Sequence, residues 1–176
     1  MTEPTPSRPP GAQLAGWLGG LVRSHNTGAL AALRRPDPPQ RIEHHYRAAS
    51  FAPNPEEEPY YQLTAFLFAR YHAGATAPRP GFGDMGAALR RVGNGATRGP
   101  ENPGVKRLLT LITASREVPV RHLQHAIDRV RSHNSAPPAW DLLPEDLARW
   151  KQRGRPVADA WGRSFYTPSY TNRNPK

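Results

Sequence analysis

Apolar side chains recur every three or four positions along most of the chain, and this spacing constrains the fold more than any other feature. Leu14, Leu18 and Val22 mark one such stripe, and Leu123 and Ile127 belong to another. Because an α-helix repeats every 3.6 residues, each stripe would lie on one helical face. No useful stretch alternates apolar and polar residues as a half-buried strand does. We therefore predict an all-α fold of eight or nine helices.

Prolines and glycines divide these stripes and suggest how the chain is organised. We expect a disordered N-terminal tail over residues 1–11, an N-terminal helical lobe over 12–93, a C-terminal helical lobe over 94–166 and a polar tail over 167–176. The segment GNGATRGPENPG, residues 93–104, is the predicted loop and lobe boundary. The result would be a two-lobed helical bundle.

Two of the expected helices carry specific packing predictions. In the helix expected over about residues 41–50, we place three side chains inward: Ile42, Tyr46 and Ala49. In the longer helix expected over about 56–73, the predicted buried stripe comprises Tyr60, Leu63, Leu67 and Tyr71. Three of the four tryptophans lie in the last 40 residues, where we expect them to pack the C-terminal helices together.

The composition favours an anionic partner. The net charge is +10, and 21 of the 24 basic residues are arginine, whose planar fork suits phosphate. Codon bias also explains a preference for arginine over lysine, but it does not explain the excess of positive charge. The chain has no cysteine and no apolar run long enough to span a bilayer, and its N-terminus lacks the pattern of a signal peptide. We expect a soluble, cytoplasmic protein.

The positive charge is concentrated between Asp84 and Arg131, where nine basic side chains face four acidic ones. This stretch contains two amphipathic helix patterns, and on them Arg107 and Arg121 fall away from the apolar stripes. A solvated surface would also explain such charges, but the imbalance persists over several helices with few acidic partners. An ordered arginine-rich face is typical of phosphate binding, here to nucleic acid backbones with little sequence preference.

Catalytic and metal sites find little support in the sequence. Seven histidines are present, but no thiolate can join them and no His-Glu-x-x-His pattern occurs. The carboxylates at 56–58 and 145–146 lie at predicted helix starts, where they would compensate the helix dipole. We therefore expect no catalytic residue, no metal and no cofactor.

The order of several short motifs resembles a known family, the CasB-type small subunit of the type I-E CRISPR Cascade complex. The resemblance covers roughly residues 13–166. It is carried by Trp17-x3-Leu21, Ala32-Leu33-Arg34-Arg35, Tyr46-Arg47, Gly86-x2-Leu89-Arg90-Arg91, Val105-Lys106-Arg107-Leu108-Leu109, Arg121-His122-Leu123, Trp140-Asp141-Leu142-Leu143-x3-Leu147-x2-Trp150 and Trp161-x3-Phe165.

This resemblance implies a non-catalytic, two-lobed subunit that takes part in antiviral defence. Such subunits usually occur as two copies, contact other Cascade subunits, and help hold the guide RNA, the target DNA and the displaced DNA strand of the R-loop. Carried onto this chain, the residues that contact nucleic acid would be Arg34, Arg35, Arg90, Arg91, Lys106, Arg107, Arg116, Arg121 and Arg129.

Two other hypotheses stay open from the sequence. The chain could be a stand-alone helical protein that binds RNA or DNA, or a nuclease whose active site the motifs do not reveal. Neighbouring genes would separate the first from a Cascade subunit, and metal-dependent cleavage of labelled nucleic acid would identify the second.

Overall fold

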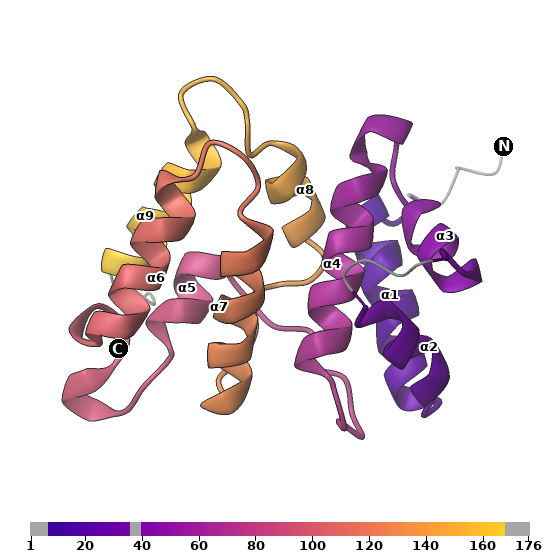
Figure 1. Cartoon of the computed structure of the whole chain (residues 1–176), viewed down its shortest axis with the longest axis horizontal. Helices are drawn as coiled ribbons and strands as arrows, with labels where there is room; N and C mark the ends of the chain where they lie inside the picture. The colour runs from indigo at the N-terminus through magenta and orange to yellow at the C-terminus, as the bar shows by residue number, and fades with distance from the viewer. Residues whose placement is uncertain (1–6, 36–39, 168–176) are drawn as a thin grey trace, which may run out of the picture.

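A computed structural model describes residues 7–35 and 40–167, which form nine α-helices, three short 3-10 turns and no strand. The all-α prediction is therefore confirmed. Figure 1 shows α4 near the middle of the molecule, with α1, α2 and α3 on one side and α5 to α9 on the other. The helices are α1 (Pro10–Arg23), α2 (Thr27–Leu33), α3 (Glu43–Ala49), α4 (Glu58–Tyr71), α5 (Met85–Arg90), α6 (Pro103–Ala114), α7 (Val120–Ser132), α8 (Leu143–Ala148) and α9 (Pro156–Tyr166).

Side-chain caps fix several of these helix starts. The Asn26 side chain accepts a hydrogen bond from the Ala29 backbone N–H at the start of α2, and the Asp84 side chain does the same for Ala87 of α5. Asn102 accepts from two backbone N–H groups at the start of α6. Each cap satisfies a donor that the first helical turn would otherwise leave unpaired. The polar residues between the apolar stripes thus set where the helices begin.

The central helix α4 is buried on more than one face because it contacts α1, α2, α3, α7 and α8. Leu67 and Tyr71 are buried as predicted, but Tyr60 and Leu63 are only half-buried. All six positions from Thr64 to Ala69 are buried, which no single stripe describes. A helix surrounded by others loses the one-sided periodicity on which the prediction depended.

In α3 the inward prediction is correct for Ala49 and wrong for Ile42 and Tyr46. Ile42 is the N-cap residue and is 41% exposed, while Tyr46 is 62% exposed. Helix α3 has only seven residues and buries only Ala48 and Ala49, so two small side chains make its contact with the core. A short helix can be anchored by a contact too small to give an apolar stripe.

The three C-terminal tryptophans are buried, as expected, and each indole N–H has a partner. Trp150 and Trp161 lie with their ring centroids 4.9 Å apart. The indole N–H of Trp150 donates to the Ser115 carbonyl at 3.1 Å, and that of Trp161 to the Asp146 carboxylate at 2.8 Å. Trp140 donates to the Arg79 carbonyl. These bonds remove the cost of burying a polar N–H and join segments distant in sequence.

The core is continuous from α1 to α9. Helix α5 lies before the lobe boundary expected at residue 93, but it packs against α9, α7 and α6. The segment 93–104 is itself packed: the Gly99 N–H donates to the Val92 carbonyl at 2.8 Å, and its second 3-10 turn contacts α5, α6 and α9. The division into two lobes stays a prediction, and the packing groups α5 with the C-terminal helices.

The connection from α4 to α5 and the connection from α7 to α8 are also bonded to each other. Residues 71–83 meet residues 131–140 through several hydrogen bonds, among them Tyr71 Oη to the Ser135 carbonyl at 2.7 Å and Arg131 to the Ala73 carbonyl at 2.7 Å. The Phe82 N–H donates to the Pro137 carbonyl, and the Ala139 N–H donates to the Gly83 carbonyl. We refer to this set of bonds as the junction.

The expected tails fall mostly outside the described residues. Helix α1 starts at Pro10, so residues 10 and 11 are helical rather than part of the tail expected over 1–11. Proline suits this position because the first turn needs no N–H from it. Residues 1–6 and 168–176 lie outside the described part. Within that part, every helix is too short or too polar to cross a membrane.

Candidate nucleic-acid interface

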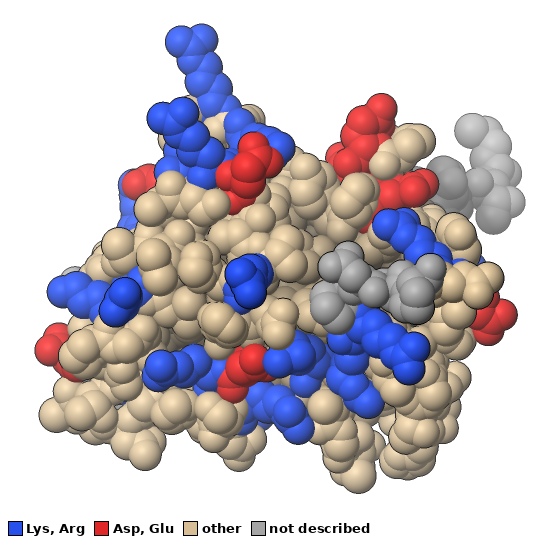
Figure 2. Space-filling model, viewed as in Figure 1, with Lys and Arg blue, Asp and Glu red and all other residues tan. Residues whose placement is uncertain are grey.

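Basic side chains gather on one face of the molecule (Figure 2). Figure 2 shows Lys and Arg side chains running across this face from over α6 and α7 toward α4 and the α2–α3 connection, with acidic atoms interrupting them. We give the name basic band to six exposed residues of α6, α7 and the α2–α3 connection: Arg35, Arg41, Lys106, Arg107, Arg121 and Arg129. Arg131 of α7 is also exposed, but it is left out because its side chain already donates to the Ala73 carbonyl.

The clearest grouping within the band is a groove between α6 and α7. Arg107 of α6 and Arg129 of α7 both line this groove, which encloses about 710 Å³. His122, His125 and Asp128 also line it. The apolar stripes of α6 and α7 are buried against the core, so the helical period turns these polar side chains toward the surface. The structure thus brings together two predicted contact residues that are 22 positions apart in sequence.

Other predicted residues are exposed but stand apart from the groove. Arg121 lies on the first turn of α7, Lys106 on the first turn of α6, and Arg116 in the α6–α7 connection. An exposed arginine or lysine of this kind meets phosphate without losing a protein partner. These three side chains therefore add positive charge around the groove without forming a shared pocket with it.

Arg90 and Arg91 differ from the rest because the fold already uses their guanidinium groups. Arg90 donates to the Phe165 carbonyl at 2.6 Å. Arg91 donates from one nitrogen to the carbonyls of Phe82, Ala136 and Pro137, at 2.9 to 3.1 Å, and lies 4.0 Å from the Phe82 ring centroid. Burial lowers the pKa of Arg91 below its ordinary value. Both residues contribute to the packing of α5, so we leave them out of the basic band.

The N-terminal pair also divides. Arg34 is half-buried and caps the end of α2, while Arg35 is exposed and lines a second groove beside α4. Arg41 lines the same groove and is a residue that the sequence did not single out. Its only sequence signal is its place on the other side of a proline-rich connection from Arg35, and that alone could not show that the two share a groove.

Arg70 is a second residue that the sequence did not single out. It lies on α4 and forms a two-point ion pair with Asp128 of α7, at 2.7 and 2.9 Å. Both carboxylate oxygens of Asp128 are engaged, which offsets the negative charge that it brings to the face. The pairing joins residues 58 positions apart, a distance over which helical periodicity carries no information.

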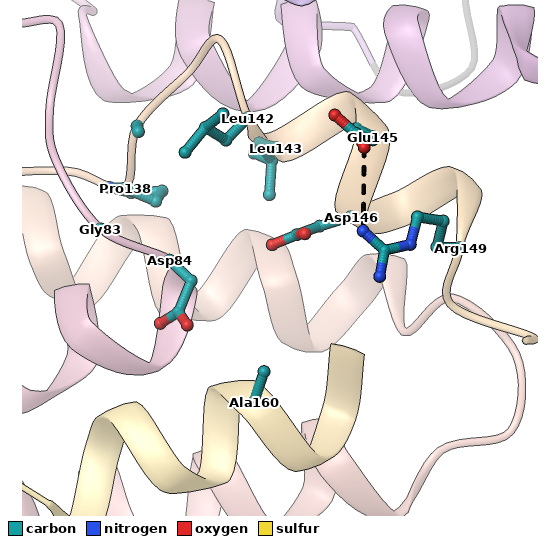
Figure 3. A pocket seen from close by; sticks show the side chains of 10 residues that line it. Gly83, Asp84, Pro138, Leu142, Leu143, Glu145, Asp146, Arg149 and Ala160 are labelled. Atoms are coloured by element: carbon teal, nitrogen blue, oxygen red, sulfur yellow. Dashed lines mark ion pairs between the residues drawn. The ribbon is translucent and has the colours of Figure 1, made fainter. Parts of the chain in front are cut away.

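A hollow of about 400 Å³ between α5, α8 and α9 is the place where a carboxylate active site could be sought. Figure 3 shows Asp84 and Asp146 on different sides of this hollow, with Glu145 beside Arg149. Asp84 caps α5 and accepts from Ser164 at 2.6 Å, and Asp146 accepts from the Trp161 indole at 2.8 Å. Burial raises the pKa of Asp146 above its ordinary value, although the Trp161 bond opposes this.

These bonds give both aspartates a structural role in joining α5, α8 and α9. A metal-dependent nuclease needs carboxylates that converge on one ion. In the part of the chain that the structure describes, no group of three or more His, Asp or Glu side chains is arranged to hold a metal. The hollow therefore offers no support for the nuclease hypothesis.

Comparisons with known proteins agree on one family. The family model of the CRISPR-associated protein Cse2 matches residues 29–166. The crystal structure of CasB from Thermobifida fusca has a TM-score of 0.66 at 18% identity, covering 90% of this chain and 98% of that one. A Cse2-family protein from Thermus thermophilus has a TM-score of 0.66 at 23% identity, covering 92% of this chain and 100% of that one.

A chain in a solved CRISPR RNA-guided surveillance complex has a TM-score of 0.66 at 24% identity, covering 89% of this chain and 90% of that chain. At such identities these structures show a shared helical fold. The comparison with curated protein sequences gives no match. The resemblance inferred from the order of the motifs is confirmed by the family model, which matches more than half of the residues. The chain belongs to the Cse2 family of CRISPR-associated proteins.

Proposed function

We propose that this chain is a non-catalytic small subunit of a type I-E CRISPR Cascade complex, and that its basic band holds nucleic acid by the backbone. Family membership supports the place in such a complex, as does the fold shared with a chain of a solved surveillance complex. The observation that carries the binding role is the basic band, above all the approach of Arg107 and Arg129 in the α6–α7 groove.

The mechanism follows from the energetics of strand exchange. Opening a DNA duplex while forming a guide RNA–target DNA duplex is nearly balanced in free energy. Contacts to phosphates that exist only in the opened state therefore shift the balance toward it. Exposed arginines supply such contacts and release counterions without reading bases. The partners in this proposal are the guide RNA, the target DNA, the displaced strand, the other Cascade subunits and a second copy of the chain.

A charge-removal experiment tests this role. In the assembled complex, we expect Arg107→Ala combined with Arg121→Ala to weaken target DNA binding. The slope of log K against log salt should become shallower by about 0.7 to 0.9 for each lost phosphate contact. The measurement is a binding titration at several salt concentrations, with a thermal melt beside it. Because both side chains are exposed, stability should change by less than about 0.5 kcal/mol.

The matched control removes the same charge elsewhere. Arg8→Ala combined with Arg153→Ala changes two exposed residues outside the basic band. This pair should leave the salt slope unchanged. An equal effect of the two pairs would show that net charge alone matters, and no effect of either would contradict the proposed role of the band.

A further inference from the structure

A second groove opens beside α4, and it differs in chemistry from the α6–α7 groove. It encloses about 630 Å³ between the end of α2, α3, α4 and the segment leading into α7. Its apolar wall is formed by Tyr60, Leu63 and Phe66 of α4 together with Val118 and Val120. Tyr60 and Leu63 are half-buried and Val120 is 41% exposed, so this wall is open to a ligand. We call it the α4 groove.

Among the described residues, the charged side chains that line the α4 groove are all basic. Arg35 and Arg41 line it and are both exposed, and no acidic side chain is among the described residues that line it. An apolar hollow with positive charge at its edge suits a ligand that is flat and apolar in one part and anionic in another. The groove also lies beside α7, since Val120 lines it while Arg121 follows on the same helical turn.

Besides the apolar wall and the positive charge, an unpaired hydrogen-bond donor constrains which ligand would suit the α4 groove. His45 lines the groove, and its Nδ1 accepts from the Ile42 backbone N–H at 3.3 Å. In the neutral ring the proton therefore lies on Nε2. This Nε2 is buried and has no hydrogen-bond partner among the residues that the structure describes. Because a buried polar atom without a partner is costly, a small rotation of the His45 ring that brings Nε2 to a ligand acceptor in the groove would be favourable.

We propose that the α4 groove binds one unstacked base of a single-stranded nucleic acid. The base would lie against Tyr60, Leu63 and Val120, and a carbonyl oxygen or ring nitrogen of the base would accept the His45 hydrogen bond. The adjoining phosphates would meet Arg35 and Arg41. Every nucleobase offers a flat face and an acceptor, so the groove would favour single strands over duplexes rather than one sequence. This inference rests on the proposed function and adds a base subsite to a surface described so far only by its phosphate contacts.

The experiment compares two single strands of equal length and charge, an oligothymidylate and a strand whose sugars carry no bases. Fluorescence anisotropy gives the affinity of the purified full chain for each at low salt. A base subsite should make the thymidylate bind at least about 5-fold tighter, since stacking on protein side chains contributes on the order of 1–3 kcal/mol per base. Val120→Trp fills the groove and should reduce this ratio toward one without weakening the baseless strand.

The matched control is Leu142→Trp, because Leu142 is 53% exposed and lies at the start of α8, outside both grooves. It should leave the ratio of the two affinities as in the unchanged protein. His45→Phe keeps a ring of similar size but removes the donor, so it should lower the thymidylate affinity about 2- to 10-fold and spare the baseless strand. A thermal melt of each variant checks folding.

The possible failures are distinguishable. Equal binding of the two strands, unchanged by Val120→Trp, would overturn the base subsite and leave the basic band standing. Binding of neither strand would contradict the proposed function and the subsite together. If Val120→Trp left both affinities unchanged but prevented assembly with other subunits, the groove would be a protein interface and the proposal would be wrong.

Discussion

At the scale of single residues, His72 shows how a titratable group can be fixed in one state by its surroundings. It is 1% exposed and stacks on Phe68 with ring centroids 4.0 Å apart. Its Nδ1 donates to the Phe68 carbonyl at 2.9 Å, and its Nε2 accepts from the Arg79 N–H at 2.9 Å. Both nitrogens are used by the neutral ring. Burial, aided by the charge of Arg79, lowers the pKa to about 4 from 6.5.

We expect this histidine to make the fold less stable as the pH falls from about 6.5 to about 4. The unfolded chain takes up a proton at its higher pKa while the folded chain does not, so protons favour unfolding across this window. A difference of this size corresponds to at most about 3 kcal/mol in the free energy of unfolding. Urea denaturation at a series of pH values measures the loss.

The control variant is His72→Gln, which cannot titrate. Its stability should vary less steeply over the same pH window, whatever its stability at neutral pH. Asp146 works in the opposite sense, because a carboxyl whose pKa is raised by burial binds protons better in the folded state. Subtracting the stability profile of His72→Gln from that of the unchanged protein gives the contribution of His72 alone. Parallel profiles would show that His72 is already charged or solvated in the folded protein.

For the arginines, the sequence predicts which side chains are exposed but not which ones bond to distant parts of the chain. Helical periodicity correctly places Arg107 and Arg121 on the exposed face, because the neighbouring apolar residues define the buried side. It cannot show that Arg91 reaches the carbonyls of Ala136 and Pro137, 45 and 46 positions away. Whether an arginine serves the fold or the surface depends on distant backbone that only the folded chain brings near.

At the scale of helices, the contact between α5 and α9 is unusually close. A Cβ placed on Gly86 would lie 1.9 Å from the Trp161 carbonyl oxygen, so only glycine lets the two helices approach this far. The backbone of Gly86 is ordinary helix, and what it needs is the absence of a side chain. The α5–α9 contact also gives Arg90 its bond to Phe165.

We expect Gly86→Ala to destabilise the protein by about 2 kcal/mol or more, because the added methyl group must push the two helix backbones apart. Gly162→Ala on α9 is the matched control, since a Cβ there meets nothing within 4 Å. That change should be neutral or stabilise by up to about 1 kcal/mol through helix propensity. Urea denaturation of both variants measures the difference, and similar stabilities would mean that α5 and α9 are further apart.

The sequence predicted the helices but not which helices pack together. The helices themselves were predictable, because stripes, caps and prolines act over a few residues. The grouping of α5 with α9 was not, because many residues separate the two helices and neither pattern names its partner. Tyr60 and Leu63 were predicted as core, but α4 has neighbours on several sides and no single buried stripe. The two side chains are half-buried and form part of the wall of the α4 groove.

At the scale of the whole molecule, the continuous core predicts cooperative unfolding. Apolar residues from α1 to α9 belong to one cluster, and α4 contacts helices of both halves. We expect a single urea transition in which far-UV circular dichroism and tryptophan fluorescence coincide. In Trp17→Phe, fluorescence would report only on Trp140, Trp150 and Trp161, which all lie in the C-terminal half. Transitions that separate would support two lobes that unfold independently.

The junction has a mechanical consequence. The side chains of Tyr71 and Arg131 each donate a hydrogen bond to the backbone of the opposite connection. Arg91 donates to a carbonyl in each connection, that of Phe82 and that of Ala136. Moving α4 relative to α7 would require several of these bonds to break together. We therefore expect α4 and α7 to keep their relative positions when the molecule moves. The protein should move as one rigid body, so that any change of its position in an assembly would be a tilt or a translation of the whole chain.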